Sequence, residues 1–288
     1  MTKQIIVILI FLWGSTGCTR DKSKMLGADI TLFEGTEAWE LAIAVEDEDT
    51  LEIVRLIREG ISVDTREDKF GQSLLIWAAY TGHYNSAKTL LQNGADPSLT
   101  DEYNGKSATL VASNYGFFGG KGVNAGYDTS VAMLKLILDY GGSPNQVCKG
   151  KHPDNIHTIK TPLMEAVSCC LYKTQLLVER GADVNFGNGF QSVLFSAAHG
   201  GKDRELILKY LLIEKDADFK NKYAFTISGD TLRLTDLLRS WVEPLNSEEY
   251  RVKMEIVEFL QQNGMNYWET AVPKHLFANY PNEYLDKY

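Results

Sequence analysis

The chain has 288 residues, 44% of them hydrophobic and 23% charged, which is enough for an ordered core in one large domain or two ordinary ones. Its 29 basic and 38 acidic residues give a net charge of −9, which argues against a nucleic-acid-binding protein, because such a protein needs a basic face. Four cysteines are too few for a disulfide-stapled miniprotein, and seven prolines with 24 glycines are too few for a collagen-like chain.

The first residues have the pattern of a secretory signal. Lys3 precedes nine consecutive apolar residues, Ile5 to Trp13. Nine is far short of the roughly 20 that span a bilayer, but it suits the apolar region of a signal peptide. Ser15-Thr16-Gly17-Cys18 follows, and small residues ending in Gly-Cys resemble the lipobox of bacterial lipoproteins, with Ser15 standing where that motif usually has leucine. An ordinary secretory signal or a buried amino-terminal strand is the alternative.

The lipobox resemblance implies a signal peptide over residues 1–17 and lipidation of Cys18. Two or three acyl chains would hold the protein firmly, because each buried methylene contributes about 0.8 kcal/mol. The resemblance therefore implies a lipid-anchored protein of the bacterial cell envelope. Thr19, rather than aspartate, follows the cysteine, which by the same resemblance favours the outer membrane where the cell has one. The polar stretch after it predicts a flexible tether over residues 18–36.

Internal repetition is the main signal in the rest of the chain. Each clear copy has a Ser or Thr, an apolar run with alanine, and then a second apolar run ending in Gly-Ala-Asp or a variant of it. The three clearest copies are Ser73–Ala79 with Leu90–Asp96, Thr161–Ala166 with Leu177–Asn185, and Ser192–Ala198 with Leu212–Asp218. They resemble the ankyrin repeat. Weaker copies run over Trp39–Gly60, Ser107–Gly141 and Thr231–Gly264.

This resemblance implies an all-α ankyrin-repeat solenoid with five to six repeats and insertions, over residues 37–267. Each repeat has a helix-turn-helix and a hairpin loop, and stacking buries the apolar faces that no single repeat covers alone. Residues 268–288 are expected to form a carboxy-terminal cap. We expect the second helices to end at Gly60, Gly94, Gly141, Gly181, Asp216 and Gly264.

Individual residues support the helix boundaries independently. Thr161 is suited to cap a first helix, and Pro162 suits the next position, where its missing N–H would be unpaired anyway. Gly94 and Gly181 allow the left-handed turn that ends a second helix. Asp183 then favours the turn into a hairpin.

No convincing catalytic or nucleotide-binding set accompanies the repeats. Gly105-Lys106-Ser107 is the tail of a phosphate loop, but Thr100 stands where that loop needs a glycine. The five histidines have no nucleophile elbow or catalytic-cysteine signature beside them. We therefore expect a non-enzymatic protein without a cofactor or metal. A hydrolase hidden in residues 220–288 is a further hypothesis that no motif supports.

Two further regions leave alternatives open. A glycine- and aromatic-rich insertion at 115–127 is either a binding loop or a tolerated flexible insertion. Cys148, His152, Asp154 and His157 have side chains suited to zinc, although their spacing matches no familiar finger. The alternative function is thus a metal- or redox-linked envelope protein that uses Cys148, His152, His157, Cys169 and Cys170. In an oxidising compartment Cys148 could also form a disulfide with Cys169 or Cys170.

By the ankyrin resemblance, the partner is another protein, bound by the hairpin tips and the groove face of the first helices. The family's variable positions map to Lys69, Phe70, Gln72, Tyr80, Thr81, Tyr103, Asn104, Lys106, Asn114 and Tyr115, with Asn188, Gln191 and His199 in the fifth repeat. Aromatic residues suit an interface, but Phe70 or Tyr80 could instead pack onto a neighbouring repeat, and Trp77 favours the core. We expect a monomer.

Overall fold

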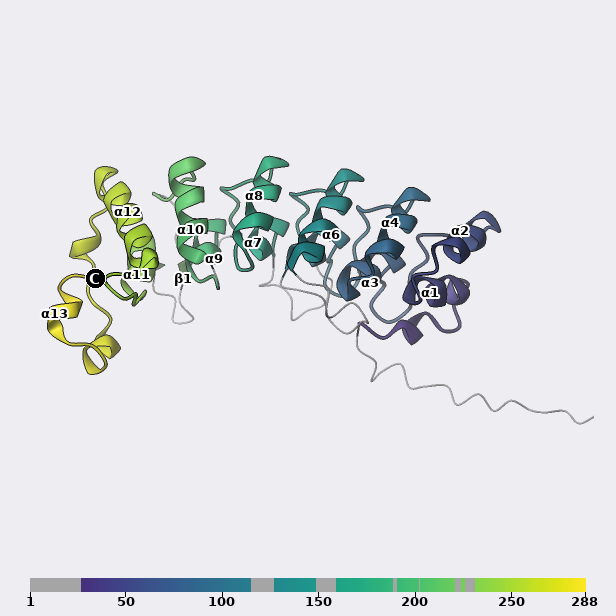
Figure 1. Cartoon of the computed structure of the whole chain (residues 1–288), viewed down its shortest axis with the longest axis horizontal. Coiled ribbons are helices and arrows are strands. Elements are labelled where there is room, and N and C mark those ends of the chain that lie inside the picture. The colour runs from purple at the N-terminus through teal and green to yellow at the C-terminus, as the bar shows by residue number, and fades with distance from the viewer. Residues whose placement is uncertain are drawn as a thin grey trace, which may run out of the picture.

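The computed structural model describes residues 27–114, 127–148, 159–188, 191–201, 203–220, 224–225 and 231–288. Within these residues, helices pair antiparallel and the pairs stack side by side into a curved row (Figure 1). The predictions that concern Cys18, Tyr115, the rest of the insertion up to Gly126, His152, Asp154 and His157 lie outside the described residues.

Six helix pairs occupy the described part of the chain. They are α1 (Trp39–Glu46) with α2 (Thr50–Arg58), α3 (Leu74–Thr81) with α4 (Tyr84–Gln92), α5 (Ala108–Ser113) with α6 (Tyr127–Asp139), α7 (Pro162–Ala166) with α8 (Leu171–Glu179), α9 (Val193–Ala198) with α10 (Arg204–Lys209), and α11 (Leu234–Arg239) with α12 (Glu248–Gln262). A π-helical turn, Tyr210–Glu214, continues α10. The weakest predicted copy, 231–264, thus contributes a helix pair like the others.

The structure confirms the all-α class. In the described residues the only strands are β1 (Ala224–Phe225) and β2 (Thr231–Leu232), which form a short antiparallel hairpin before α11. Each first helix packs on the first helix of the next pair, as α3 does on α5 and α5 on α7, and the second helices stack in the same order. Local pairing of this kind is the defining property of a solenoid.

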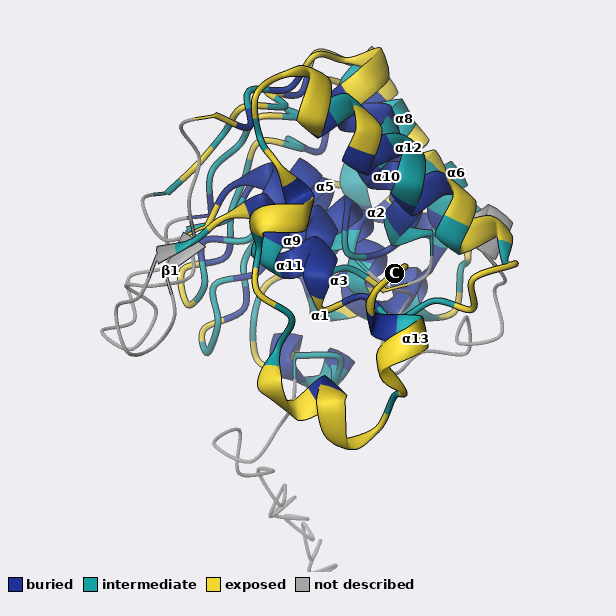
Figure 2. Ribbon diagram, turned by 90° about the vertical axis from the view of Figure 1, so that its left-hand side faces the viewer, coloured by how far each residue is buried: buried dark blue, intermediate teal, exposed yellow. Residues whose placement is uncertain are grey.

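One elongated apolar core runs through the stack, between the two layers of helices (Figure 2). Leu90, Leu177 and Leu212, from three different second helices, are fully buried in it. Ala78 and Ala197 are also fully buried, and their small side chains let neighbouring first helices approach closely. The repeats therefore share one core, as the sequence pattern predicts.

Helix ends follow the predicted residues. The Thr161 hydroxyl accepts a hydrogen bond from the Met164 N–H at 3.3 Å, which caps α7. A left-handed backbone ends the second helix at every predicted position, with positive φ at Gly60, Gly94, Gly141, Gly181, Asp216 and Gly264. Asp216 adopts this conformation at φ 49°. Aspartate tolerates the left-handed region better than most other non-glycine residues.

The prediction of a flexible tether as far as residue 36 is wrong for its last part. Residues 30–33 form a 3₁₀ helix, in which Ile30, Leu32 and Phe33 are buried in the main core. The Asp29 carboxylate caps this helix by accepting a hydrogen bond from the Thr31 N–H at 3.0 Å. The folded domain thus starts before residue 30, because these apolar side chains complete the core that α1 leaves open.

The carboxy-terminal segment folds beneath the last helix pair (Figure 1). It contains two 3₁₀ helices, Tyr267–Glu269 and Lys274–Ala278, and α13 (Asn282–Leu285). Leu276, Leu285 and Tyr288 form a small core of their own there. Among the described residues, none of the helices has the length and apolar character that a bilayer crossing requires.

Candidate protein-binding surface

The first helices and the loops that precede them form one side of the array, here called the concave surface. Each such loop, or finger, closes where an isolated β-bridge joins its two ends, and the fingers are numbered by their repeats. The bridges are Arg66–Ser73 in the second finger, Thr100–Ser107 in the third and Gly187–Ser192 in the fifth. Neighbouring fingers are also tied together, because the Arg66 guanidinium donates a hydrogen bond to the Thr100 carbonyl at 2.8 Å. The repeated pattern thus presents successive fingers in register.

A pocket of about 170 Å³ opens on the concave surface between the second and third fingers. Its walls are Gly27, Phe70, Gln72, Ile76, Tyr80, Asp101, Tyr103, Asn104, Lys106 and Val111. Six of these are predicted partner-binding residues, from two fingers and the first helix between them. Residues that are far apart in the sequence are therefore gathered at one place by the repeat geometry.

Aromatic side chains form the rim of this pocket. The Phe70 and Tyr103 rings meet edge to face, with centroids 5.6 Å apart, and the Lys69 ammonium lies 4.7 Å from the Phe70 centroid. Tyr103 is 40% exposed, whereas Tyr80 is half-buried and burial raises the pKa of its hydroxyl. Rigid, partly exposed rings of this kind are the usual energetic anchors of protein interfaces.

Buried carboxylates hold the two fingers in shape. The Glu67 carboxylate accepts hydrogen bonds from the N–H groups of Lys69, Phe70 and Gln72. One repeat later, Asp101 does the same for Asn104, Gly105 and Lys106. Burial raises the pKa of Asp101, and these N–H donors oppose that rise. Both carboxylates therefore serve the finger backbone rather than a partner.

Two of the predicted partner-binding residues are part of the scaffold instead. Thr81 is fully buried, and its hydroxyl donates to the Trp77 carbonyl at 2.8 Å and lies 2.7 Å from His83 Nδ1. Gln72 is only 6% exposed, and its amide donates to the Gly27 carbonyl at 2.7 Å. Neither side chain is available to a docking protein, because each already satisfies a buried hydrogen bond.

Residues 27–33 cover part of the concave surface themselves. Besides the contact of Gln72 with Gly27, the Trp77 indole N–H donates to the Ala28 carbonyl at 3.2 Å. Trp77 is thereby 1% exposed, which confirms its predicted place in the core. The sequence gives no signal for this contact, because the repeat pattern starts only after these residues.

The remaining predicted positions differ in their roles. Asn114 ends α5, and its carbonyl accepts a hydrogen bond from the buried Lys173 ammonium at 2.7 Å. In the fifth repeat, the Asn188 amide donates to the Ile159 carbonyl at 2.8 Å, while Gln191 and His199 are exposed. The concave surface therefore continues past the pocket with polar, accessible side chains.

The cysteines do not form the disulfide considered for them. Cys148, Cys169 and Cys170 are buried free thiols. Cys148 donates to the Asn104 carbonyl at 2.6 Å, whereas the Cys169 and Cys170 sulfurs lie 3.4 Å from each other. No group of three potential metal ligands occurs among the residues that the structure places.

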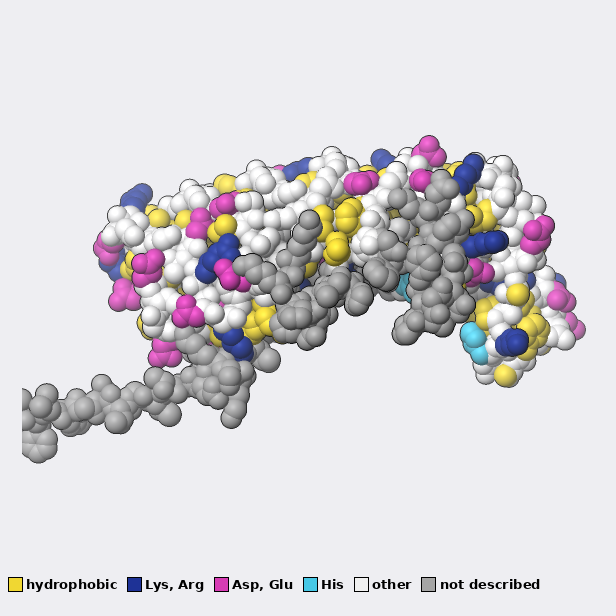
Figure 3. Space-filling view, turned by 180° about the vertical axis from the view of Figure 1, so that it is seen from behind, with side chains coloured by type: hydrophobic (Ala, Val, Ile, Leu, Met, Phe, Trp, Pro, Cys, Tyr) yellow, Lys and Arg dark blue, Asp and Glu magenta, His cyan; other side chains and the backbone are white. Residues whose placement is uncertain are grey.

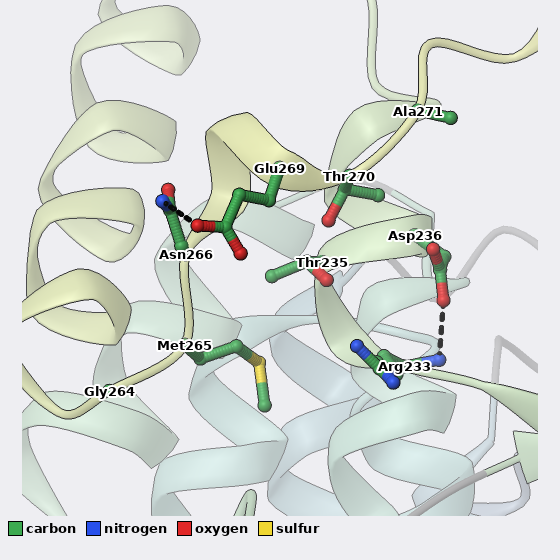
Figure 4. Close-up of a pocket in the computed structure, with 9 residues that line it drawn as sticks. All are labelled: Arg233, Thr235, Asp236, Gly264, Met265, Asn266, Glu269, Thr270 and Ala271. Atoms are coloured by element: carbon green, nitrogen blue, oxygen red, sulfur yellow. Dashed lines mark hydrogen bonds between the residues drawn. The ribbon is translucent and has the colours of Figure 1, made fainter.

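A second, larger pocket of about 620 Å³ lies beside the start of α11 at the end of the array (Figure 4). Its polar lining includes Arg233, Asp236 and Glu269, and the Asn266 amide donates to the Glu269 carboxylate at 2.9 Å. Arg233 and Glu269 are exposed. The pocket lies on the free side of the last repeat, where no further helix pair packs in the described chain. Sequence reasoning did not single it out.

Stacked helix pairs with bridged fingers define the class of protein, a repeat solenoid with a concave surface. Residues 27–118 match the family model for ankyrin repeats (3 copies). This part of the chain thus carries ankyrin repeats, and the later helix pairs, which lie outside the matched range, are consistent with a continuation of the same array. None of the curated proteins compared with the chain matches it. Ankyrin repeats suggest a scaffold for protein–protein interaction.

Proposed function

We propose that this protein is a non-enzymatic scaffold, lipid-anchored at Cys18 in a bacterial cell envelope, which binds a partner protein on its concave surface and thereby neutralises or assists it. The observation that carries the proposal is the pocket between the second and third fingers, where Phe70, Tyr80 and Tyr103 meet. Its volume of about 170 Å³ suits one large side chain of a partner better than a drug-sized ligand, which usually fills roughly 300 Å³ or more.

The ends of the chain support the choice of the concave surface. Residues 27–33 lie against α1 and α3 on this side, and the segment with α13 projects to the same side at the other end of the array (Figure 1). A partner would therefore lie along the fingers, with one terminal segment at either end. The second helices form the opposite layer.

The charge distribution supports a protein partner rather than a nucleic acid. The net charge is −9, and basic side chains are interspersed with acidic ones on the face shown in Figure 3. A nucleic-acid site would need a continuous basic face. The overall acidity suits a basic partner, by long-range attraction rather than by one charged contact.

Affinity capture from the cell envelope tests the proposed surface. The bait is the chain from residue 19 onward, and the test variant combines Phe70→Ala with Tyr80→Ala. Tyr172→Ala, which removes an equally aromatic side chain that is 64% exposed on α8, is the matched control. We expect the control to capture the same protein as the unmodified bait and the double variant to lose it. Equal capture by all three baits would disprove the placement of the site.

The anchor needs a separate test. The proposal expects a diacylglyceryl group on Cys18 in the mature protein, detected by mass spectrometry of its amino-terminal peptide. Cys18→Ser should release the protein from membranes. A mature chain without lipid at this position would disprove the anchor and leave the concave binding surface untouched.

A further inference from the structure

We propose that the anchor holds the concave surface toward the membrane, so that the partner is a protein segment displayed at the bilayer surface. This inference rests on the proposed lipidation of Cys18. It concerns which face of the array a membrane-bound partner meets, and it follows from where the chain enters the folded domain.

The entry point lies in the candidate binding surface itself. Gly27 is a wall of the pocket that Phe70 and Tyr80 also line. Two side-chain donors fix the entering backbone, since Gln72 binds the Gly27 carbonyl at 2.7 Å and Trp77 binds the Ala28 carbonyl at 3.2 Å. Directly afterwards, Ile30, Leu32 and Phe33 are buried in the core. The backbone therefore enters the folded domain at a fixed place on the concave surface.

The distance from anchor to entry point is limited by covalent geometry. Nine peptide steps separate Cys18 from Gly27. Even a fully extended chain covers only about 30 Å over that number of steps. The side of the pocket formed by Gly27 thus stays within about 30 Å of the lipid headgroups. The second helices lie roughly 10 Å behind the first helices, so their largest possible distance from the headgroups is greater by about that amount.

Confinement at this distance favours a partner in the same membrane. A site tethered so closely has a high effective concentration for a segment displayed on that surface and a much lower one for a protein held elsewhere. The lipid itself is a poor occupant, because the protein is acidic overall and the pocket has one lysine, Lys106, in its wall. A protein segment with one large apolar side chain fits the pocket better.

Förster resonance energy transfer from the protein to dyes in the bilayer tests whether the concave surface faces the membrane. The lipidated full-length protein is reconstituted into phosphatidylethanolamine–phosphatidylglycerol vesicles whose headgroups carry an acceptor dye. A donor dye is introduced through a non-natural amino acid at Asp68, on the second finger, or at Lys88, on α4. Both positions are exposed and belong to the same repeat. We expect higher transfer from position 68 than from position 88.

A lengthened tether provides the control. Inserting a Gly-Ser segment of about 40 residues between Lys22 and Ser23 leaves the lipid and the fold in place but extends the reach several-fold. The difference between positions 68 and 88 should then disappear. Equal transfer from both positions with the native tether, in protein shown by mass to carry the lipid, would overturn the inference alone. Protein without the lipid would overturn the proposed anchor, and this inference with it.

The class of partner needs its own measurement. A photo-crosslinking amino acid at Glu102, an exposed finger residue next to Tyr103, is expected to label a membrane-embedded or membrane-anchored protein in intact envelopes. The same group at Lys88 is the control for random encounters. Labelling from position 102 that is confined to soluble proteins would contradict the inferred partner class.

Discussion

The Trp77 indole donates a hydrogen bond to the backbone carbonyl of Ala28, 49 residues earlier in the chain, at 3.2 Å. Trp77 lies on α3, the first helix of the second pair, and is 1% exposed. The chain's own amino-terminal segment thus covers the first part of the candidate binding surface. This contact links the stability of the first repeats to the position of the segment that leads to Cys18.

Substituting Trp77→Phe should loosen the amino-terminal segment. Phenylalanine keeps most of the apolar area but loses the N–H donor, which leaves the Ala28 carbonyl without this partner. We expect a loss of about 1–2 kcal/mol in the free energy of unfolding, measured with urea. Backbone amides of Leu32 and Phe33 should exchange faster with deuterium.

Leu51→Ala is the matched control for Trp77→Phe, because Leu51 is 83% exposed on α2. Its effect should stay within about 0.5 kcal/mol. Unchanged amide exchange at Leu32 and Phe33 in the Trp77 variant would show that the segment is held by its own buried side chains alone.

The carboxy-terminal end of α5 depends on a buried cation. The Lys173 ammonium, 1% exposed, donates to the carbonyls of Ala112 and Asn114 at 2.8 and 2.7 Å, at the end of α5. Burial lowers the pKa of Lys173. Lys173→Met should reduce the free energy of unfolding by about 2–3 kcal/mol, because two carbonyls lose their donor. Calorimetry or urea unfolding measures this loss.

The exposed Lys135 offers a comparison for Lys173. It pairs with Asp139 at 2.6 Å on the surface of α6. Lys135→Met should change stability by less than about 1 kcal/mol, because solvent screens the pair. Equal effects of the two substitutions would mean that the carbonyls at the end of α5 find other donors.

The repeat pattern predicted most of this fold because each repeat carries its own boundary residues. The left-handed turns at Gly94 and Gly181 and the cap at Thr161 depend on neighbours only a few residues away. The contact between Trp77 and Ala28 joins residues that are far apart in the chain, and no residue near Ala28 in the sequence predicts it. The end of the tether was therefore misplaced by several residues.

The candidate binding site was predicted less completely, for a similar reason. The family's variable positions include Phe70, Tyr80 and Tyr103, and the regular repeat geometry gathers these three residues around one pocket. The same positions included Thr81, which is buried because its hydroxyl bonds to the Trp77 carbonyl within α3 and lies against His83. A family position defines which face of a helix a residue occupies, but its burial depends on the neighbouring side chains.

A buried lysine in the last helix pair should make the free energy of unfolding rise with pH in the alkaline range. The Lys253 ammonium is fully buried, donates to the Trp241 carbonyl at 2.8 Å and lies 4.3 Å from the Tyr288 ring centroid. Burial, with the nearby positive charge of Arg239, lowers the pKa of Lys253 to about 7. In the unfolded chain the amine keeps its ordinary pKa near 10.4.

Between these two values the unfolded state binds a proton that the folded state does not. The free energy of unfolding should therefore rise with pH from about 7 to about 9.5, by up to roughly 1.4 kcal/mol per pH unit. Above that range the tyrosines interfere, because burial raises the pKa of Tyr288 to about 12. Urea unfolding at pH 7.5, 8.5 and 9.5 measures the slope, and Lys253→Met should lack this contribution. Parallel slopes for the two proteins would contradict the assignment.

The thiols should be unreactive as long as the protein is folded. Burial raises the pKa of Cys148, whose thiol donates to the Asn104 carbonyl, and Cys169 and Cys170 are also buried. Thiol reagents attack the thiolate, so a buried thiol with a raised pKa reacts slowly. We expect Ellman's reagent to detect almost none of these three cysteines in native lipidated protein at pH 8 and all three in urea. A native sample in which urea exposes only one thiol would indicate a disulfide between Cys148 and one of the adjacent pair, and would contradict the structure.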